Sequence, residues 1–193
     1  MQIFFQFERP AFIVFYVITF FWIGEFLIFP SQYKGKDQRE TKSFLKILFA
    51  ILTSHLITFV LTLLDVFRID TLNHPLMILA LVTYPLGLGL RYISILYLGH
   101  HFTRHVEVSR SQMLISKGPY RILRHPLYLG LFLLTISVPL FFQNWGMTII
   151  SSIGMFLILN HRMSIEEKMM SDVIGDTYLA WKEKRYRFIP WLY

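Results

Sequence analysis

Two short polar runs carry the residue types best able to bind a charged ligand. The first, GPYRILRHPLYLG, extends from Gly118 to Gly130 and joins a basic segment to an apolar one. Pro126 suits the first turn of a helix because its missing N–H is not needed there, which places His125 at the helix N-terminus. Unpaired N–H groups and the positive end of the helix dipole favour an anion at that position. The run therefore predicts either a site for a ligand carboxylate or a basic turn that docks on phospholipid headgroups.

The second run, RMSIEEK, extends from Arg162 to Lys168 and follows a long apolar stretch. Arg162 and Glu166 are four residues apart, so on a helix they share one face. In a binding site they would supply a cation and a hydrogen-bond acceptor. If they are exposed, the same pair is a solvated helix end that contributes only about 0.3 kcal/mol. Both interpretations are open at the level of the residues.

Aromatic residues are mixed with arginines towards the C-terminus. Tyr178, Trp181 and Tyr186 precede or begin the ending YRFIPWLY. Such residues near a bilayer form an interfacial anchor, or they close a pocket over a flat ring.

Thiol and metal chemistry are not expected. The chain has no cysteine, which excludes disulfides, thiolate metal sites and cysteine nucleophiles. The seven histidines show no repeated metal-ligand spacing, so no metal site is expected. Catalysis would depend on other side chains or on a cofactor.

Five apolar segments must position these runs. With 193 residues, 54% hydrophobic and only 16% charged, and a mean hydropathy of +0.49, the chain is too apolar for an ordinary soluble domain. We expect an all-α polytopic membrane protein, whose segments approach the roughly 20 residues that cross a bilayer core. Gln143 and Asn144 separate the last two segments, which predicts a helical hairpin. The expected segments are Pro10–Phe29, Phe44–Leu64, Leu76–Leu98, Leu127–Phe142 and Trp145–Leu159, the last continuing past Asn160.

The third segment contains unusual residues. Pro85, Gly87 and Gly89 are expected to bend or thin the helix. Arg91 is a charge inside an apolar segment, where it either snorkels to the nearby interface or faces a pocket.

The basic residues gather on one side of the predicted membrane. The chain has 19 Lys and Arg against 12 Asp and Glu, which gives a net charge of 19 − 12 = +7. The basic residues lie mainly in the loop after the first segment, in the loop after the third and in the C-terminal tail. Only Arg9 and Arg68 fall on the opposite side. The distribution predicts an N-terminus outside and a C-terminus in the cytoplasm, and it accounts for the charge without nucleic acid.

Taken together, these runs resemble the isoprenylcysteine carboxyl methyltransferase family of membrane enzymes. The likeness rests on GPYRILRHPLYLG, on RMSIEEKMMSDVIGDTYLAWKEKRYRFIP and on LGHHFTRHVEV ahead of both. It covers about residues 91–190, whereas the first two segments match only as generic hydrophobic helices. The resemblance implies a helical fold, S-adenosylmethionine as methyl donor, and a pocket between the basic loop, the hairpin and the C-terminal segment.

The resemblance also implies roles for individual residues. Arg162 matches a position that contacts the substrate near the reacting group. Gln112 departs from the family, which often has histidine there. The residues implied to line the cofactor site are Gln112, Met113, Leu114, Ile115, Tyr120, His125, Pro126, Leu127, Tyr128 and Glu166.

The chemistry of the donor is consistent with these roles. His125 and the helix N-terminus can meet its carboxylate, Glu166 its ammonium or ribose hydroxyls, and Tyr120 or Tyr128 its adenine ring. Direct displacement at a methyl group needs alignment of the reactants rather than a catalytic nucleophile.

The acceptor and the setting follow as expectations. The acceptor is a lipid-tailed small molecule or a lipidated substrate that enters from the membrane, and Arg162 would orient an anionic group such as a carboxylate. Residues 1–193 are expected to form one domain, with three spans in 1–98 and the catalytic part in 99–193, in a bacterial cell membrane. The alternatives are a phospholipid N-methyltransferase, an NADPH-dependent membrane reductase and a non-catalytic scaffold.

Overall fold

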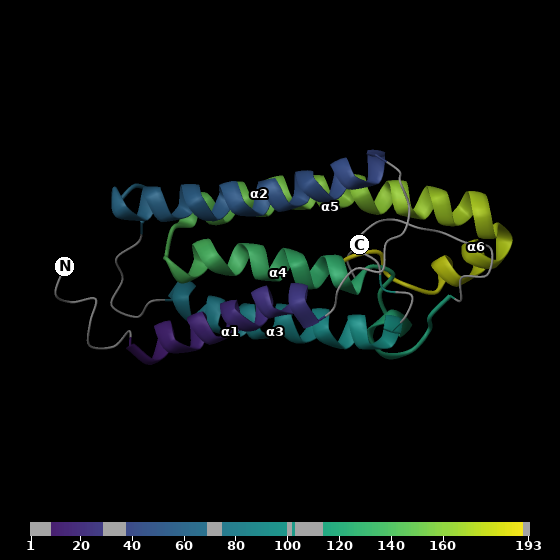
Figure 1. The fold of residues 1–193 in the computed structure, drawn as a ribbon, viewed down its shortest axis with the longest axis horizontal. Helices are drawn as coiled ribbons and strands as arrows, with labels where there is room; N and C mark the ends of the chain where they lie inside the picture. The colour runs from purple at the N-terminus through teal and green to yellow at the C-terminus, as the bar shows by residue number, and fades with distance from the viewer. Residues whose placement is uncertain (1–8, 29–37, 69–74, 100–101, 103–113, 191–193) are drawn as a thin grey trace.

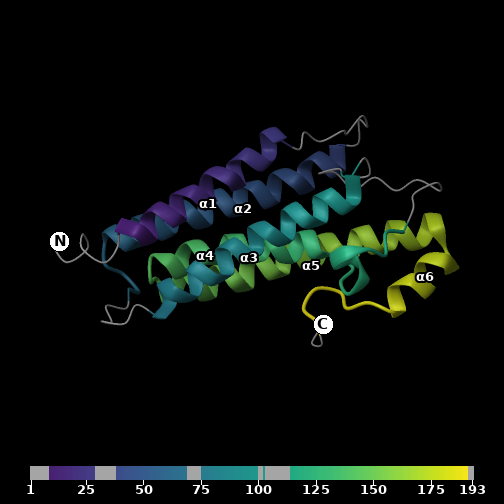
Figure 2. The ribbon, with the colours of Figure 1, turned by 90° about the horizontal axis from the view of Figure 1, so that it is seen from below.

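Five long helices run lengthwise along the molecule in alternating directions. The computed structural model describes residues 9–28, 38–68, 75–99, 102 and 114–190. Figures 1 and 2 show α2 beside α5, α1 beside α3, and α4 between the two pairs. The elements are α1 (Arg9–Ile28), α2 (Gln38–Leu63), α3 (Pro75–Leu98), the short 3₁₀ helix η3 (Gly118–Arg121), α4 (Pro126–Phe141), α5 (Trp145–Ile174) and α6 (Asp176–Glu183). The predicted all-α fold is confirmed for the described residues.

Fewer helices are long and apolar enough to cross a membrane than the five long helices of the fold. Three helical segments are long and apolar enough to cross a membrane, namely Phe44–Leu63, Pro75–Leu98 and Trp145–Ile174. The apolar parts of α1 and α4, Pro10–Glu25 and Pro126–Phe141, are shorter. All five predicted segments are helices in the structure, and their number as membrane spans stays a prediction.

The hairpin between α4 and α5 is confirmed, and Asn144 builds its turn. The Asn144 side chain accepts a hydrogen bond from the Met147 N–H at 2.9 Å, which caps the start of α5. Its amide also donates to the Val66 carbonyl at 3.0 Å. This turn therefore ties the hairpin to the segment that follows α2.

Glycine allows α3 and α4 to pack closely. A Cβ atom on Gly130 would lie 2.8 Å from the Gly87 carbonyl oxygen and 2.6 Å from Cγ of Arg91. At Gly89 a Cβ atom would meet nothing within 4 Å. Of the two glycines expected to thin the helix, Gly87 does so, because the absence of a side chain there lets α4 approach α3 closely. Pro85 is accommodated inside a continuous α3.

Aromatic rings fill the core between α1, α3 and α4. Phe15 stacks on Phe141 with ring centroids 4.2 Å apart, and Tyr84 packs against Phe15 at 5.2 Å. Large apolar side chains remain exposed on the outward faces of α1 and α2, as expected for helices in contact with lipid.

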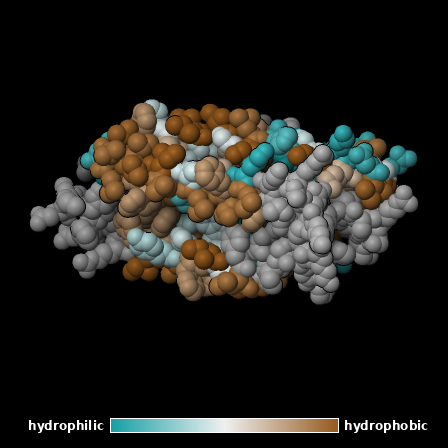
Figure 3. All heavy atoms as spheres, turned by 45° about the horizontal axis from the view of Figure 1, so that its top comes forward, coloured by the Kyte–Doolittle hydropathy of each residue, from teal (hydrophilic) through white to brown (hydrophobic). Residues whose placement is uncertain are grey.

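The outer surface separates into an apolar body and a polar end. Apolar side chains dominate where the long helices lie side by side, and polar side chains gather where α5 extends beyond them (Figure 3). A helix of 30 residues is about 45 Å long, whereas the hydrocarbon core is about 30 Å thick. The last turns of α5, with α6 beside them, therefore project past the apolar body (Figure 1).

Candidate active site

The start of α4 is shaped by a glycine and two prolines. Gly118 has φ +54, and a Cβ atom there would collide with the Tyr97 ring, so the position requires glycine. Pro119 begins η3, and Pro126 begins α4 with His125 as its N-cap, as the sequence predicted. The His125 side chain makes no cap hydrogen bond and turns instead towards α5.

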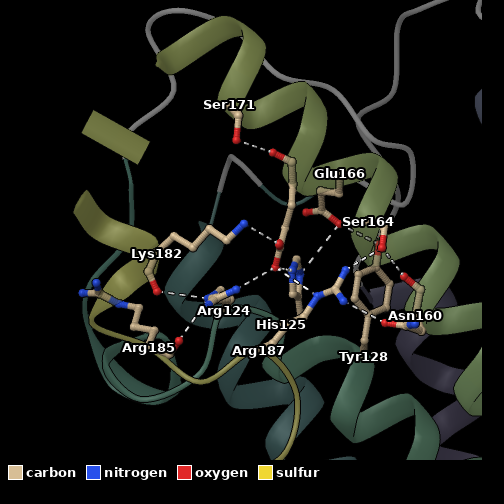
Figure 4. A network of polar contacts seen from close by, with 11 residues as sticks. Arg124, His125, Tyr128, Asn160, Ser164, Glu166, Ser171, Lys182, Arg185 and Arg187 are labelled. Atoms are coloured by element: carbon tan, nitrogen blue, oxygen red, sulfur yellow. Dashed lines mark hydrogen bonds and ion pairs between the residues drawn. The ribbon is translucent and has the colours of Figure 1, made fainter. Parts of the chain in front are cut away.

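Glu167 is the centre of a polar network at this end of the bundle. Figure 4 shows its partners Arg124, His125 and Lys182 pointing towards one another. Its Oε1 lies 3.2 Å from Nη1 of Arg124, 3.1 Å from Nε2 of His125 and 3.2 Å from Nε of Arg187. Its Oε2 lies 3.1 Å from Nζ of Lys182. One buried carboxylate thus connects α5 with the start of α4, with α6 and with the C-terminal segment.

A second carboxylate lies one residue earlier and belongs to a shorter chain of contacts. Nε of Arg162 donates to the Tyr128 hydroxyl at 2.8 Å, and this hydroxyl donates to Oε2 of Glu166 at 2.9 Å. Arg162 is only 4% exposed, whereas the Glu166 side chain is 31% exposed. The predicted shared face of Arg162 and Glu166 is observed. Because Arg162 is buried, the pair is not a solvated helix end.

The C-terminal segment folds back across α5. Arg187 donates from Nη1 to Oδ1 of Asn160 at 2.8 Å and from Nη2 to Oγ of Ser164 at 2.6 Å (Figure 4). Phe188 is fully buried, with its ring 5.5 Å from that of Phe132 in α4 and 5.9 Å from that of Phe156 in α5. The segment is therefore held both by polar contacts and by a ring between the hairpin helices.

Helix α6 is fastened to the loop before α4. Nε1 of Trp181 donates to Oγ of Ser116 at 2.9 Å, and the guanidinium of Arg185 lies 4.3 Å from the centroid of the Trp181 ring. Nε of Arg185 donates to the Tyr120 carbonyl at 2.7 Å. Tyr178 is buried and stacks on Trp181. Tyr178 is thus packed inside this end, whereas Trp181 is half-buried and Tyr186 is exposed, so both the pocket wall and the interfacial anchor stay predictions.

Two tyrosines of this end are held neutral. Burial, and to a smaller extent the charge of Glu166, raise the pKa of Tyr120 well above its ordinary value. Burial and the charge of Glu167 likewise raise the pKa of Tyr178. Both hydroxyls therefore stay protonated over the physiological pH range and can donate a hydrogen bond.

Comparison with family models assigns the chain to a known family. The model of the isoprenylcysteine carboxyl methyltransferase (ICMT) family matches residues 76–172, which is half of the 193-residue chain. The chain belongs to this family. The matched region contains η3, α4, α5 up to Asp172 and nearly all of α3, and so it includes both carboxylates of the site.

Members of the family with similar sequences are longer than this chain. Protein-S-isoprenylcysteine O-methyltransferase of Schizosaccharomyces pombe is 27% identical over 107 residues, covering 54% of this chain and 45% of that protein. The protein of the same name from Saccharomyces cerevisiae is 27% identical over 146 residues, covering 75% of this chain and 61% of that protein. The chain thus spans about half of the length of these relatives.

A solved structure shares the fold. The eukaryotic intramembrane Ras methyltransferase ICMT superposes with a TM-score of 0.68 at 20% sequence identity, over 97% of this chain and 70% of that one. At this identity the likeness shows a common architecture. It extends over α1 and α2, which the family model does not match.

The residues that the resemblance implied are gathered at one end where the structure describes them. Tyr120, His125, Tyr128, Arg162 and Glu166 all belong to the polar end described above. Leu127 is half-buried beside them, and Pro126 is buried. Leu114 and Ile115 are half-buried and lie four and three residues before the start of η3. Gln112 and Met113 lie outside the described residues, and all roles in cofactor binding stay predictions.

Several members of the network were missed by the sequence reasoning. Glu167 is adjacent to Glu166, and the doubled acidic pair was the signal that could have pointed to it. The remaining missed residues, Arg124, Lys182 and Arg187, had been counted only as basic residues that set the orientation.

Arg91 does not snorkel to the interface, and that alternative is wrong. It is 8% exposed and binds Glu25 of α1, with Nε 2.6 Å from Oε2. A partner inside the bundle makes it unnecessary for the guanidinium to reach water.

Proposed function

We propose that this protein transfers a methyl group from S-adenosylmethionine to the carboxyl group of a lipid-tailed acceptor of the isoprenylcysteine type. The observation that carries the proposal is the chain of contacts from Arg162 through the Tyr128 hydroxyl to Glu166. It sets a cation and a carboxylate on two sides of one hydroxyl at the polar end of an apolar bundle. The names of the relatives support the same chemistry.

The residues suit a positively charged donor that carries an amino-acid tail. When bound, S-adenosylmethionine would supply a methyl group that passes from its cationic sulfur to an acceptor oxygen, with the sulfur leaving as a neutral thioether. Glu166 is exposed enough to receive hydrogen bonds from a ligand ammonium or hydroxyl group. In the first turn of α4, Pro126 has no N–H and the N–H groups of Tyr128 and Leu129 donate to the His125 carbonyl, so the Leu127 N–H is the backbone donor that would meet a ligand carboxylate. The ring of His125 contacts Glu167, so we assign His125 the role of holding the start of α4 against α5 beside the donor.

Arg162 is the residue that orients the acceptor. Its Nε donates a hydrogen bond to the Tyr128 hydroxyl, and this bond restricts rotation of the guanidinium about the side-chain bonds of Arg162. A guanidinium held in this way binds a carboxylate through charge-assisted hydrogen bonds and aligns one oxygen for attack. Burial of the group excludes water from the reacting oxygen and strengthens its interaction with the cation.

The setting follows from the same proposal. Residues 1–193 act as one membrane-embedded domain, with the N-terminus outside and the polar end of α5 in the cytoplasm. A soluble donor then reaches the site from the cytosol, and the acceptor reaches it from the membrane. The excess of Lys and Arg in the loop after α3 and in the tail supports this orientation.

Calorimetry on the detergent-purified protein tests the donor. We expect S-adenosylmethionine to bind and NADPH not to bind. Binding of NADPH alone would replace the proposal with a reductase, and binding of neither would refute enzymatic use of the site. A radiolabelled methyl group should then appear in a synthetic farnesylated cysteine, and its appearance in phosphatidylethanolamine instead would indicate an N-methyltransferase.

Three variants of α5 separate the roles of its residues. Glu166→Gln should weaken donor binding, whereas Arg162→Met should bind the donor and lose turnover. His161→Gln is the matched control, because this exposed residue lies on the same helix away from the network. Equal donor affinity and equal turnover in all three variants would contradict the assignments.

A further inference from the structure

A buried ion pair links α1 to α3 inside the bundle. Nε of Arg91 donates to Oε2 of Glu25 at 2.6 Å, and Nη2 of Arg91 pairs with Oε1 of the same carboxylate. Glu25 is fully buried and Arg91 is 8% exposed. A bidentate pair of this kind fixes the plane of the guanidinium as well as its position.

The same guanidinium also reaches α4. Nη1 of Arg91 donates to the Leu127 carbonyl at 3.2 Å, in the first turn of that helix. The next residue is Tyr128, whose hydroxyl contacts Arg162 and Glu166 at the polar end of the bundle. The Arg91 side chain has little room to move, because Gly130 packs so closely that a Cβ atom would lie 2.6 Å from Cγ. Arg91 thus holds the first turn of α4 through a donor whose direction Glu25 sets.

We propose that Glu25 and Arg91 are positioning residues for the methyl transfer: they hold the Leu127 carbonyl and so keep the Tyr128 hydroxyl between Arg162 and Glu166. The inference rests on the proposed function for its kinetic consequence. It adds a contribution from α1, a helix outside the region that the family model matches.

The pair is not the sole polar contact between α1 and α3. The Tyr92 hydroxyl donates to the Phe21 carbonyl at 2.8 Å, and the hydroxyls of Thr19 and Tyr84 lie 2.9 Å apart. A protein that lacks the ion pair therefore keeps these links. Replacing both partners with apolar residues of similar size leaves no unpaired charge, which is often neutral for stability.

The test compares Glu25→Leu/Arg91→Met with Tyr92→Phe, which removes another polar contact between the same two helices. We expect the double variant to melt near the wild-type temperature and to bind donor. Its kcat should fall about tenfold or more, the effect of one lost hydrogen bond to a charged group. Tyr92→Phe should match the wild type in all three measurements. Wild-type kcat in the double variant would overturn the proposal.

A spectroscopic measurement separates this inference from the proposed function. With 3-fluorotyrosine at position 128, the ¹⁹F signal should shift in the double variant and stay unchanged in Tyr92→Phe, whether or not methyl transfer is observed. An unchanged signal in both would overturn the positioning role. Absence of donor binding by the wild type would refute the proposed function instead.

Arg91→Lys provides a second variant if the double variant does not fold. It keeps a positive charge beside Glu25, but its three donors share one nitrogen and cannot reproduce the fork in which separate nitrogens of Arg91 reach the two carboxylate oxygens and the Leu127 carbonyl. We expect a folded protein with lowered kcat and a shifted fluorine signal. A folded Arg91→Lys protein with wild-type kcat and signal would also overturn the proposal.

Discussion

Removal of one hydroxyl group, in Tyr128→Phe, tests the centre of the proposed site with little change in volume. The hydroxyl bonds Arg162 at 2.8 Å and Glu166 at 2.9 Å, and both bonds are lost. A hydrogen bond to a charged group contributes about 1.5–3 kcal/mol. The Glu166 side chain is 31% exposed and can bond to water instead, whereas Arg162 is 4% exposed and cannot do so readily. The expected cost is therefore that of the Arg162 bond alone.

This cost should appear in catalysis more than in donor binding. A loss of about 1.5–3 kcal/mol lowers kcat/KM by about tenfold to hundredfold. Donor affinity should change less, because Glu166 keeps its charge. The assay follows transfer of a radiolabelled methyl group to a synthetic farnesylated cysteine, with donor affinity measured by calorimetry.

The control for this experiment is Tyr97→Phe, whose residue lies at the same end of the bundle and is 46% exposed. It should behave as the wild type. If Tyr128→Phe retains full kcat/KM, or if Tyr97→Phe loses as much, the argument that the hydroxyl orients Arg162 is refuted.

Three further substitutions test the scaffold. Glu167→Gln should lower the free energy of unfolding by about 2–3 kcal/mol, which is less than the full cost of unpairing a buried charge because the cations around Glu167 are partly exposed. The variant should also speed proteolysis of the C-terminal segment, and unchanged cleavage would contradict the role of Glu167 as the connecting carboxylate. Gly130→Ala should cost about 1–3 kcal/mol, since the new methyl group would lie 2.6 Å from Cγ of Arg91, while Gly89→Ala should be tolerated; equal melting temperatures would contradict the close packing. Asn144→Ala should cost about 1 kcal/mol or more through loss of the α5 cap, measured by thermal unfolding in detergent, and a wild-type melting temperature would show that the cap adds nothing.

The helices and their ends were predictable because their signals are local. Pro126 marks the start of α4, and Asn144 marks the turn before α5, each within one turn of the residue it affects. The face shared by Arg162 and Glu166 follows from helical spacing alone. These features depend on neighbours in sequence, and sequence reasoning recovered them.

The partners of the buried charges could not be predicted in the same way. Arg91 binds a carboxylate 66 residues earlier, and Arg124 binds one 43 residues later. Such pairs depend on how the helices rotate about their axes and how they pack, and nothing in a single sequence fixes either. The doubled Glu166 and Glu167 indicated an acidic site, but only the packing of α6 and the C-terminal segment shows which of the two is surrounded by cations.

The length of α5 restricts which molecules can meet its carboxylates. Glu166 follows the last apolar stretch, which ends at Leu159, by seven residues, or about 10 Å along the helix axis. A headgroup resting at the bilayer surface would stop short of this height. Glu166, which the proposed function assigns to the soluble donor, would then face the aqueous side, whereas Arg162 lies three residues past Leu159, or about 5 Å along the axis, within reach of an acceptor whose tail stays in the leaflet.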